Sequence, residues 1–128
     1  MTDITPYIIL SKPQLGENIG STARAMKNFG FKKLRLISPR DGWPNQSAYA
    51  ISAGADDVLN NIKVFNTIEQ GTHDISLLIA TTARKRVVGT KPLDVFESIE
   101  KSFEHSLNGG KVGFLFGPEQ SGLSNDDV

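Results

Sequence analysis

Three segments of the chain carry residue types that could do chemistry, and two of them directly follow a short apolar run. Residues 18–31 (NIGSTARAMKNFGF) contain Asn18 and Arg24. Residues 81–86 (TTARKR) follow the run SLLIA, and residues 117–122 (GPEQSG) follow the run VGFLF. Because open parallel sheets bind ligands at the carboxyl ends of their strands, we expect the three segments to line one site.

Taken singly, these residues have ordinary structural explanations. Asn18 is a typical helix N-cap, Arg24 could be a solvated surface arginine, and Thr81 and Thr82 are residues that favour strands. GPEQSG has the composition of a turn, and no lysine follows it as in a phosphate-binding P-loop. The chain also lacks a GxGxxG sequence after a strand, which disfavours a dinucleotide-binding oxidoreductase. The separate segments therefore leave the function open.

Composition narrows the classes of function. The chain has no cysteine, which excludes disulfides and cysteine metal sites and favours a reducing, cytoplasmic location. His73 and His105 stand far apart in the sequence, so we expect no metal site. The apolar runs are much too short for a membrane span, and residues 1–6 lack the basic region of a signal peptide.

The charge is balanced, with 14 basic and 14 acidic residues. This balance argues mildly against RNA, because binding to phosphates usually depends on a basic surplus. The basic residues are nevertheless grouped along the chain: Lys27, Lys32, Lys33 and Arg35 form one group, and Arg84, Lys85, Arg86 and Lys91 form another. A local basic patch is possible if the fold brings such groups together.

The elements that must position these residues follow the pattern of one α/β domain over residues 1–128. Short apolar runs alternate with amphipathic stretches, which predicts a mostly parallel sheet of about five or six strands with helices on both faces. Strands are expected at residues 7–10, 34–37, 63–65, 76–80 and 112–116. Helices are expected from Asn18 to about Phe29, around 47–53, near 67–70 and after Pro92. The last two strands are the most continuously apolar, so we expect them to be the central, adjacent pair.

Together the segments are far more specific than they are singly. NIGSTARAMKNFGFKKLRLISP (residues 18–39), followed near the end by LFGPEQSGLSNDD (residues 115–127), resembles the first two signature motifs of the SpoU (TrmH-type) RNA 2′-O-methyltransferases of the SPOUT superfamily. ISAGADDV (residues 51–58) and TTARKR resemble the TrmJ-type enzymes, which modify the tRNA anticodon loop. The resemblance covers about residues 8–128.

The resemblance implies a fold, a cofactor and a set of site residues. The fold would be a SPOUT α/β domain with a C-terminal trefoil knot, acting as a homodimer with S-adenosyl-L-methionine on tRNA or rRNA. The family's third motif is absent, so the chain is expected to be truncated or disordered at its C-terminal end. The matching positions are Asn18 and Arg24 in motif one, Thr81, Thr82 and Ala83 in the first cofactor loop, Gly117 in the second, and Glu119, which organises that loop.

The chemistry fits these residues with one difficulty. The sulfonium of S-adenosylmethionine activates the methyl group, so the enzyme must orient a ribose 2′-OH and help to remove its proton. The resemblance casts Arg24 as the general base, but a guanidinium holds its protons too tightly for that role near neutral pH. Arg24 could instead bind the adjacent phosphate and stabilise the developing alkoxide. Arg84 and Arg86 would contact RNA phosphates without reading sequence.

Two functions of different classes therefore remain. The first is the RNA 2′-O-methyltransferase. The second is a nucleotide- or RNA-binding α/β module without catalysis, which the neutral charge and the missing third motif favour. The sequence does not name the target nucleotide.

Overall fold

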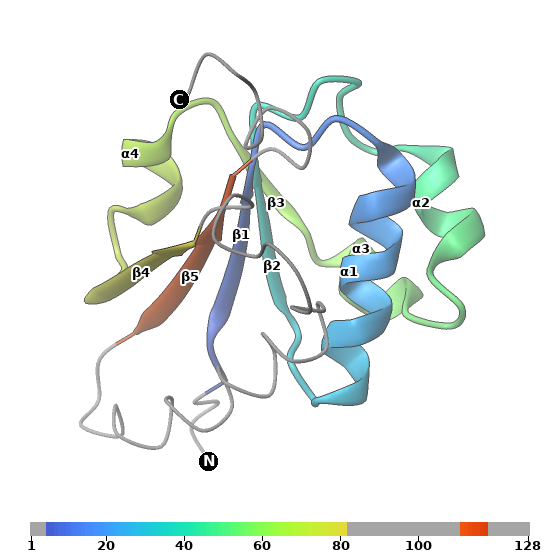
Figure 1. Ribbon diagram of the computed structural model, residues 1–128, viewed down its shortest axis with the longest axis horizontal. Helices are drawn as coiled ribbons and strands as arrows, with labels where there is room; N and C mark the ends of the chain where they lie inside the picture. The colour runs from blue at the N-terminus through green and yellow to red at the C-terminus, as the bar shows by residue number, and fades with distance from the viewer. Residues whose placement is uncertain (1–4, 82–110, 118–128) are drawn as a thin grey trace, which may run out of the picture.

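The structure is a computed structural model that describes residues 5–81 and 111–117 (Figure 1). Within these ranges a parallel sheet has the order β3-β2-β1-β5-β4. Its strands are β1 (Tyr7–Ser11), β2 (Lys33–Ile37), β3 (Lys63–Phe65), β4 (Leu77–Thr81) and β5 (Val112–Phe116). The helices are α1 (Gly16–Asn28), α2 (Gln46–Ile51), α3 (Asp56–Asn60) and α4 (Ile68–Thr72). The parallel α/β sheet predicted from the sequence is confirmed.

Helices cover both faces of the sheet, as the alternation of side chains along the strands requires. Ile8, Leu34 and Leu36 point to the face that packs against α1 and α3, where they form one buried cluster with Ile19 and Met26. The neighbouring positions on the strands face the other way. Figure 1 shows α4 on that opposite side, where Gly71 of α4 lies against Ile37 of β2.

Helix α1 begins earlier than predicted. Its N-cap is Leu15, whose backbone oxygen accepts hydrogen bonds from the amides of Asn18 and Ile19 at 3.1 and 3.4 Å. Asn18 therefore lies inside the first turn, and its prediction as the N-cap was wrong. The extended backbone of Leu15 starts the helix without a side-chain cap. The predicted end is close to the observed one, because Gly30 has a φ of 76° and the chain turns there.

A close approach between α1 and α2 fixes the helical layer. A Cβ atom at Gly20 of α1 would collide with the backbone oxygen of Ala48 in α2. Ala48 itself is fully buried. Glycine is therefore required at position 20 by packing, and the two backbones touch at this point.

Strand β4 differs most from its prediction. It pairs with β5 as expected, but in the described sheet it lies at the edge, and β1 is the central strand. Leu77 and Leu78 are 49% and 38% exposed. A continuous apolar run therefore did not identify the central strand here. The helix expected after Pro92, the knot segment and the residues after Gly117 lie outside the described residues.

Within the described ranges, no helix is long and apolar enough to cross a membrane.

Candidate active site at the carboxyl edge of the sheet

Three strands end at the same level and bring separate parts of the sequence together. Thr81 of β4 is the register partner of Phe116 of β5, and Phe116 is the partner of Leu10 of β1. The next residue after β5 is Gly117, so Thr81 and Gly117 lie at the carboxyl ends of adjacent parallel strands. The predicted neighbourhood of these two residues is confirmed. Their roles in cofactor binding stay predictions.

Gly117 borders open space. A Cβ atom built at this position meets no heavy atom of the described residues within 4 Å, and the backbone is not in the left-handed region that favours glycine. Within this part of the chain, neither packing nor backbone conformation therefore requires glycine at position 117. A ligand that approaches the backbone closely would require it.

The first turn of α1 lies at the same edge, because only residues 12–15 separate it from the end of β1 (Figure 1). Asn18 is half-buried in this turn, and its backbone oxygen accepts a hydrogen bond from Thr22 Oγ1 at 2.7 Å. The side chain of Asn18 therefore starts from a position held by the helix, close to the strand ends.

Arg24 is set back from that edge. It lies six residues beyond Asn18, which is about 9 Å along the helix axis at 1.5 Å per residue. Its side chain is exposed, on the side of α1 away from Ile19, Ala23 and Met26, and it makes no hydrogen bond or ion pair with any described residue. The structure thus places a solvent-facing guanidinium on α1. It does not bring Arg24 to Thr81 and Gly117 through any contact within this part of the chain.

The remaining predicted site residues lie outside the described ranges. They are Thr82, Ala83, Arg84, Arg86 and Glu119. Among the described residues, no group of three or more histidine, aspartate or glutamate side chains could hold a metal ion.

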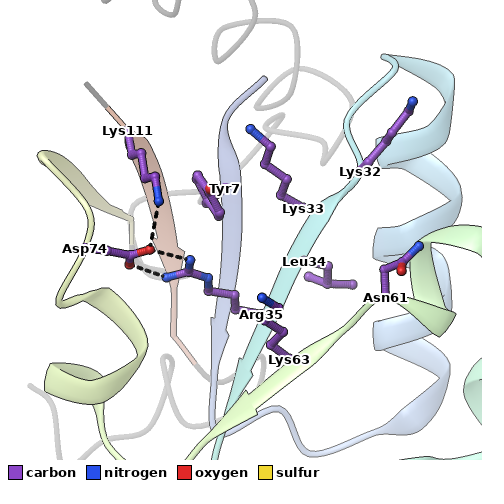
Figure 2. A pocket seen from close by; sticks show the side chains of 9 residues that line it. All are labelled: Tyr7, Lys32, Lys33, Leu34, Arg35, Asn61, Lys63, Asp74 and Lys111. Carbon is purple, nitrogen blue, oxygen red and sulfur yellow. Dashed lines mark hydrogen bonds and ion pairs between the residues drawn. The ribbon is translucent and has the colours of Figure 1, made fainter. Parts of the chain in front are cut away.

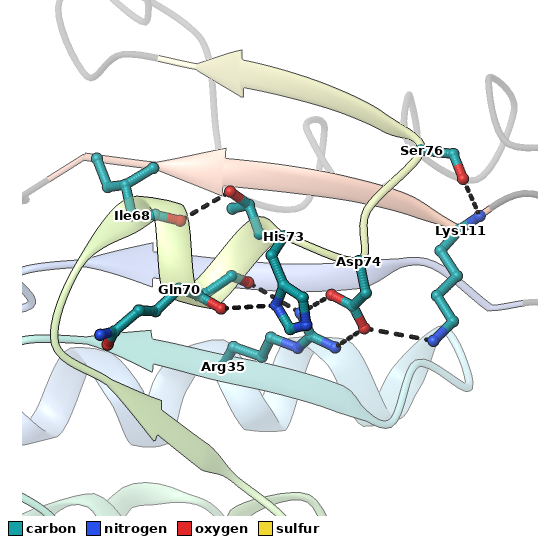
Figure 3. Close-up of polar contacts among 9 residues, drawn as sticks. Arg35, Ile68, Gln70, His73, Asp74, Ser76 and Lys111 are labelled. Carbon is teal, nitrogen blue, oxygen red and sulfur yellow. Dashed lines mark hydrogen bonds and ion pairs between the residues drawn. The ribbon is translucent and has the colours of Figure 1, made fainter.

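The opposite, amino edge of the sheet carries charged residues that the sequence interpretation did not assign to a site. The Arg35 guanidinium, only 8% exposed, forms a two-pronged ion pair with Asp74 at 2.7 and 2.9 Å and also donates to the backbone oxygen of Gly71 at 2.8 Å. Lys111 reaches the same carboxylate at 3.3 Å (Figure 3). These hydrogen bonds hold the pKa of Asp74 well below its usual range, and the bond to Asp74 raises the pKa of Arg35.

The structure places part of the first group of basic residues and leaves the second group undescribed. Lys32, Lys33 and Arg35 of the first group gather at this amino edge, whereas Lys27 pairs with Asp57 on the helical layer at 3.0 Å. Residues 84–91, which hold the second group, lie outside the described ranges. Lys63 and Lys111 join the first group through the fold. No sequence signal linked them, because they stand at the starts of different strands and are distant along the chain.

Comparison with known proteins gives a consistent result. The model of the SpoU rRNA Methylase family matches residues 5–128. An uncharacterized tRNA/rRNA methyltransferase of Haemophilus influenzae is 36% identical over 121 residues, covering 94% of this chain and 48% of the relative. The tRNA (cytidine/uridine-2′-O-)-methyltransferase TrmJ of Sodalis glossinidius is 38% identical over 121 residues, covering 94% and 47%. The chain thus spans about half the length of these relatives.

Solved structures agree with the sequence relatives. The crystal structure of TrmJ from Z. mobilis ZM4 is 52% identical, with a TM-score of 0.74 over 97% of this chain and 54% of that chain. The SpoU methyltransferase AviRb from Streptomyces viridochromogenes is 18% identical, with a TM-score of 0.63 over 98% of this chain and 47% of that chain. The second likeness concerns the fold alone.

Proposed function

This chain belongs to the SpoU rRNA methylase family and has the fold of the SPOUT methyltransferases, and we propose that the protein transfers a methyl group from S-adenosylmethionine to a ribose 2′-OH of tRNA. The main observation behind the proposal is that Thr81 and Gly117 lie at the carboxyl ends of the adjacent parallel strands β4 and β5. The relatives named as tRNA 2′-O-methyltransferases TrmJ support tRNA as the substrate.

The described part of the carboxyl edge fits the cofactor. The open space beside Gly117 would be filled by a Cβ atom, and a bound adenosine or methionine moiety would use that space instead. Thr81 and Gly117 would hold the cofactor from two sides through their loops. When bound, S-adenosylmethionine supplies an activated methyl group on a sulfonium, so no metal is needed to activate the donor.

The remaining task is to orient the ribose and to stabilise negative charge on its 2′ oxygen. The guanidinium of Arg24 is the side-chain group suited to a bidentate contact with two phosphate oxygens. Bound to the phosphate next to the target ribose, it would fix the sugar and stabilise the developing alkoxide. The 2′-OH proton would then pass to water or to the phosphate. Asn18, at the start of the same helix, would orient the ribose or the loop around it.

We further propose that the protein works as a homodimer. The position of Arg24 supports this arrangement, because its exposed side chain is set back from the strand ends of its own chain. A second subunit packed against this face of α1 would place Arg24 beside the cofactor loops of its partner.

A direct assay tests the proposed function. The full-length protein, unmodified tRNA and methyl-labelled S-adenosylmethionine are incubated together, and the RNA is digested to nucleosides for mass spectrometry. The expected product is a 2′-O-methylnucleoside. Label on a base, or tRNA binding without any methyl transfer, would contradict the proposal, and the second outcome would favour a non-catalytic RNA-binding module.

A further inference from the structure

The amino ends of the strands gather positive side chains around one pocket (Figure 2). Lys32 and Lys33 stand at the start of β2, Lys63 is the first residue of β3, and Lys111 directly precedes β5. Together with Arg35 they line a hollow of about 340 Å³. This edge lies at the other end of the strands from Thr81 and Gly117.

The charge of this pocket contrasts with the charge of the whole chain. Five cationic side chains line the pocket, and Asp74 is the one carboxylate among the described residues that line it. The whole sequence has equal numbers of basic and acidic residues. The formal excess of positive charge at this edge is therefore a product of the fold, and a cleft lined by one sign of charge focuses the field on an incoming anion.

The five cationic side chains differ in whether they already interact with other protein groups. Arg35 is buried and donates hydrogen bonds to Asp74 and to the backbone oxygen of Gly71, and Lys111 contacts the same carboxylate. Lys33 donates to the backbone oxygen of Thr5 at 3.1 Å and lies 4.7 Å from the centre of the Tyr7 ring. Lys32 and Lys63 are exposed and form no hydrogen bond or ion pair with the described residues. Two ammonium groups thus remain for a ligand.

The width of this edge favours a polyanion over a small anion. The lysines stand at the starts of β3, β2 and β5, and β1 lies between the last two, so the row is about 15 Å wide at roughly 4.8 Å per strand. One free phosphate would contact part of such a row. Successive phosphates of a nucleic acid backbone can contact Lys32 and Lys63 and lie in the field of the other cations, and phosphate contacts position RNA without reading its sequence.

We propose that this amino-edge surface, with Lys32 and Lys63 as its ligand contacts, binds phosphates of the RNA substrate at a distance from the methylated nucleotide. The inference rests on the proposed function for the identity of the RNA. Five-residue strands separate the two edges by about 17 Å, so one RNA molecule held at both must extend well beyond the target loop. The surface supplies affinity and orientation, while the carboxyl edge supplies the chemistry.

The test measures the affinity of the full-length protein for an unmodified tRNA transcript over a range of salt concentrations. The double variant Lys32→Gln/Lys63→Gln should bind about tenfold more weakly at physiological salt. Its slope of log affinity against log salt should fall by about 1.5, because each lost phosphate contact removes roughly 0.7–0.9. Lys32→Arg/Lys63→Arg keeps both charges and should retain the affinity and slope of the wild type.

Lys27→Gln is the matched control. It removes a lysine that Asp57 already neutralises at 3.0 Å, so its affinity and salt slope should stay close to those of the wild type. An unchanged affinity and slope in the double Gln variant would overturn the proposal. It would also be overturned if inorganic phosphate bound the wild type but not the double Gln variant while both proteins bound tRNA equally, because the site would then belong to a small anion.

Methylation of the same tRNA by the same preparations separates this proposal from the proposed function. A wild type that binds tRNA and does not methylate it contradicts the methyltransferase, and the double Gln variant still decides the amino-edge surface. A wild type that methylates tRNA, with a double Gln variant of unchanged affinity, contradicts the surface alone. A wild type that binds no tRNA overturns both.

Discussion

At the scale of single residues, the exposed side of α1 and the open space beside Gly117 can be tested separately. Arg24 is exposed and forms no hydrogen bond or ion pair with the described residues, so we expect its side chain to contribute little to folding. Among the residues that the structure describes, neither packing nor backbone conformation requires glycine at position 117. Substitutions at both positions should therefore change function while leaving the free energy of unfolding nearly unchanged.

Arg24→Ala should abolish 2′-O-methylation and leave the melting temperature and the affinity for S-adenosylmethionine nearly unchanged. The reason is that Arg24 is proposed to act on the ribose and its phosphate in the transition state. A loss of at least tenfold in kcat/KM corresponds to about 1.4 kcal/mol of transition-state stabilisation. Lys27→Ala, three residues further along α1, is the control. A variant that retained more than a tenth of the wild-type rate would remove Arg24 from the site.

Gly117→Val should weaken S-adenosylmethionine binding by tenfold or more, because the new side chain enters the space proposed for the cofactor. The melting temperature should change little, since a Cβ atom there meets no heavy atom of residues 5–81 and 111–117 within 4 Å. Calorimetric titration measures the first effect and thermal unfolding the second. Equal cofactor affinity in the variant and the wild type would show that the pocket lies elsewhere.

Residue types and spacing could predict the carboxyl-edge residues, because glycines and polar residues that follow apolar runs signal strand ends. The ion pairs at the amino edge could not be predicted in this way. Asp74 and Lys111 flank β4 and β5, and Arg35 lies inside β2. Their ion pairs depend on which strands become neighbours, and sequence spacing carries no information about that order.

At the scale of elements, the strand and helix positions followed from apolar periodicity, with β3 and β5 predicted at their observed bounds. The prediction for residues 44–61 was less accurate. One helix was expected there, but α2 and α3 form, separated by Ala53 and Gly54 with φ values of 51° and 91°. Two short helices with small residues between them have too few turns to produce a clear helical period.

Gly20→Ala tests the contact between α1 and α2. Alanine is favoured over glycine by about 1 kcal/mol inside a helix, so propensity alone predicts stabilisation. The Cβ atom would instead collide with the backbone oxygen of Ala48, and α2 would have to move. We expect a net loss of about 1–3 kcal/mol in the free energy of unfolding, measured by urea denaturation.

The neighbouring substitution Ser21→Ala is the control for this prediction. Ser21 is exposed on the same helix, so the change increases helix propensity without a collision. It should be neutral or slightly stabilising. If Gly20→Ala behaved in the same way as Ser21→Ala, the close contact between the two helices would be wrong.

Asp74→Asn tests the junction between α4, β4 and β2. The substitution leaves the Arg35 guanidinium in a buried position without its carboxylate, which should cost about 3 kcal/mol of stability at neutral pH. Asp57→Asn, which breaks an exposed pair with Lys27, should cost far less.

The same pair gives a pH dependence. Because the folded-state pKa of Asp74 is depressed, its contribution is complete above the unfolded pKa of about 4 and is lost as the pH falls below that value. The wild type should therefore lose stability below about pH 4 more steeply than Asp74→Asn. Parallel acid-unfolding curves for the two proteins would contradict this role for Asp74.

At the scale of the whole molecule, the balanced net charge, from which the sequence interpretation argued mildly against RNA, hides an uneven distribution of charge. The fold separates the charges, so that the amino edge is positive although the chain is neutral. Net charge is a sum over the surface, whereas a polyanion responds to the local field. A neutral chain can thus present a basic surface, and this could be recognised once the strand order was known.

The proposed homodimer makes a prediction about which subunit supplies each part of the site. If Arg24 acts on the cofactor held by the partner subunit, Arg24→Ala and Gly117→Val damage different halves of a shared site. Each variant alone should be inactive. Mixing them in equal amounts, with exchange of subunits, makes half of the dimers mixed, and one of the two sites in each mixed dimer carries both native residues. About a quarter of the wild-type activity should then return, because a two-fold interface pairs each patch with its equivalent in the partner. If Arg24 instead serves its own chain, every site in the mixed dimer contains one damaged half, and no activity returns.

The measurement is the methylation rate of the mixture against that of each variant, with size-exclusion chromatography coupled to light scattering to establish the dimer. Mixtures of stable dimers that stay inactive would place Arg24 and the cofactor in the same subunit.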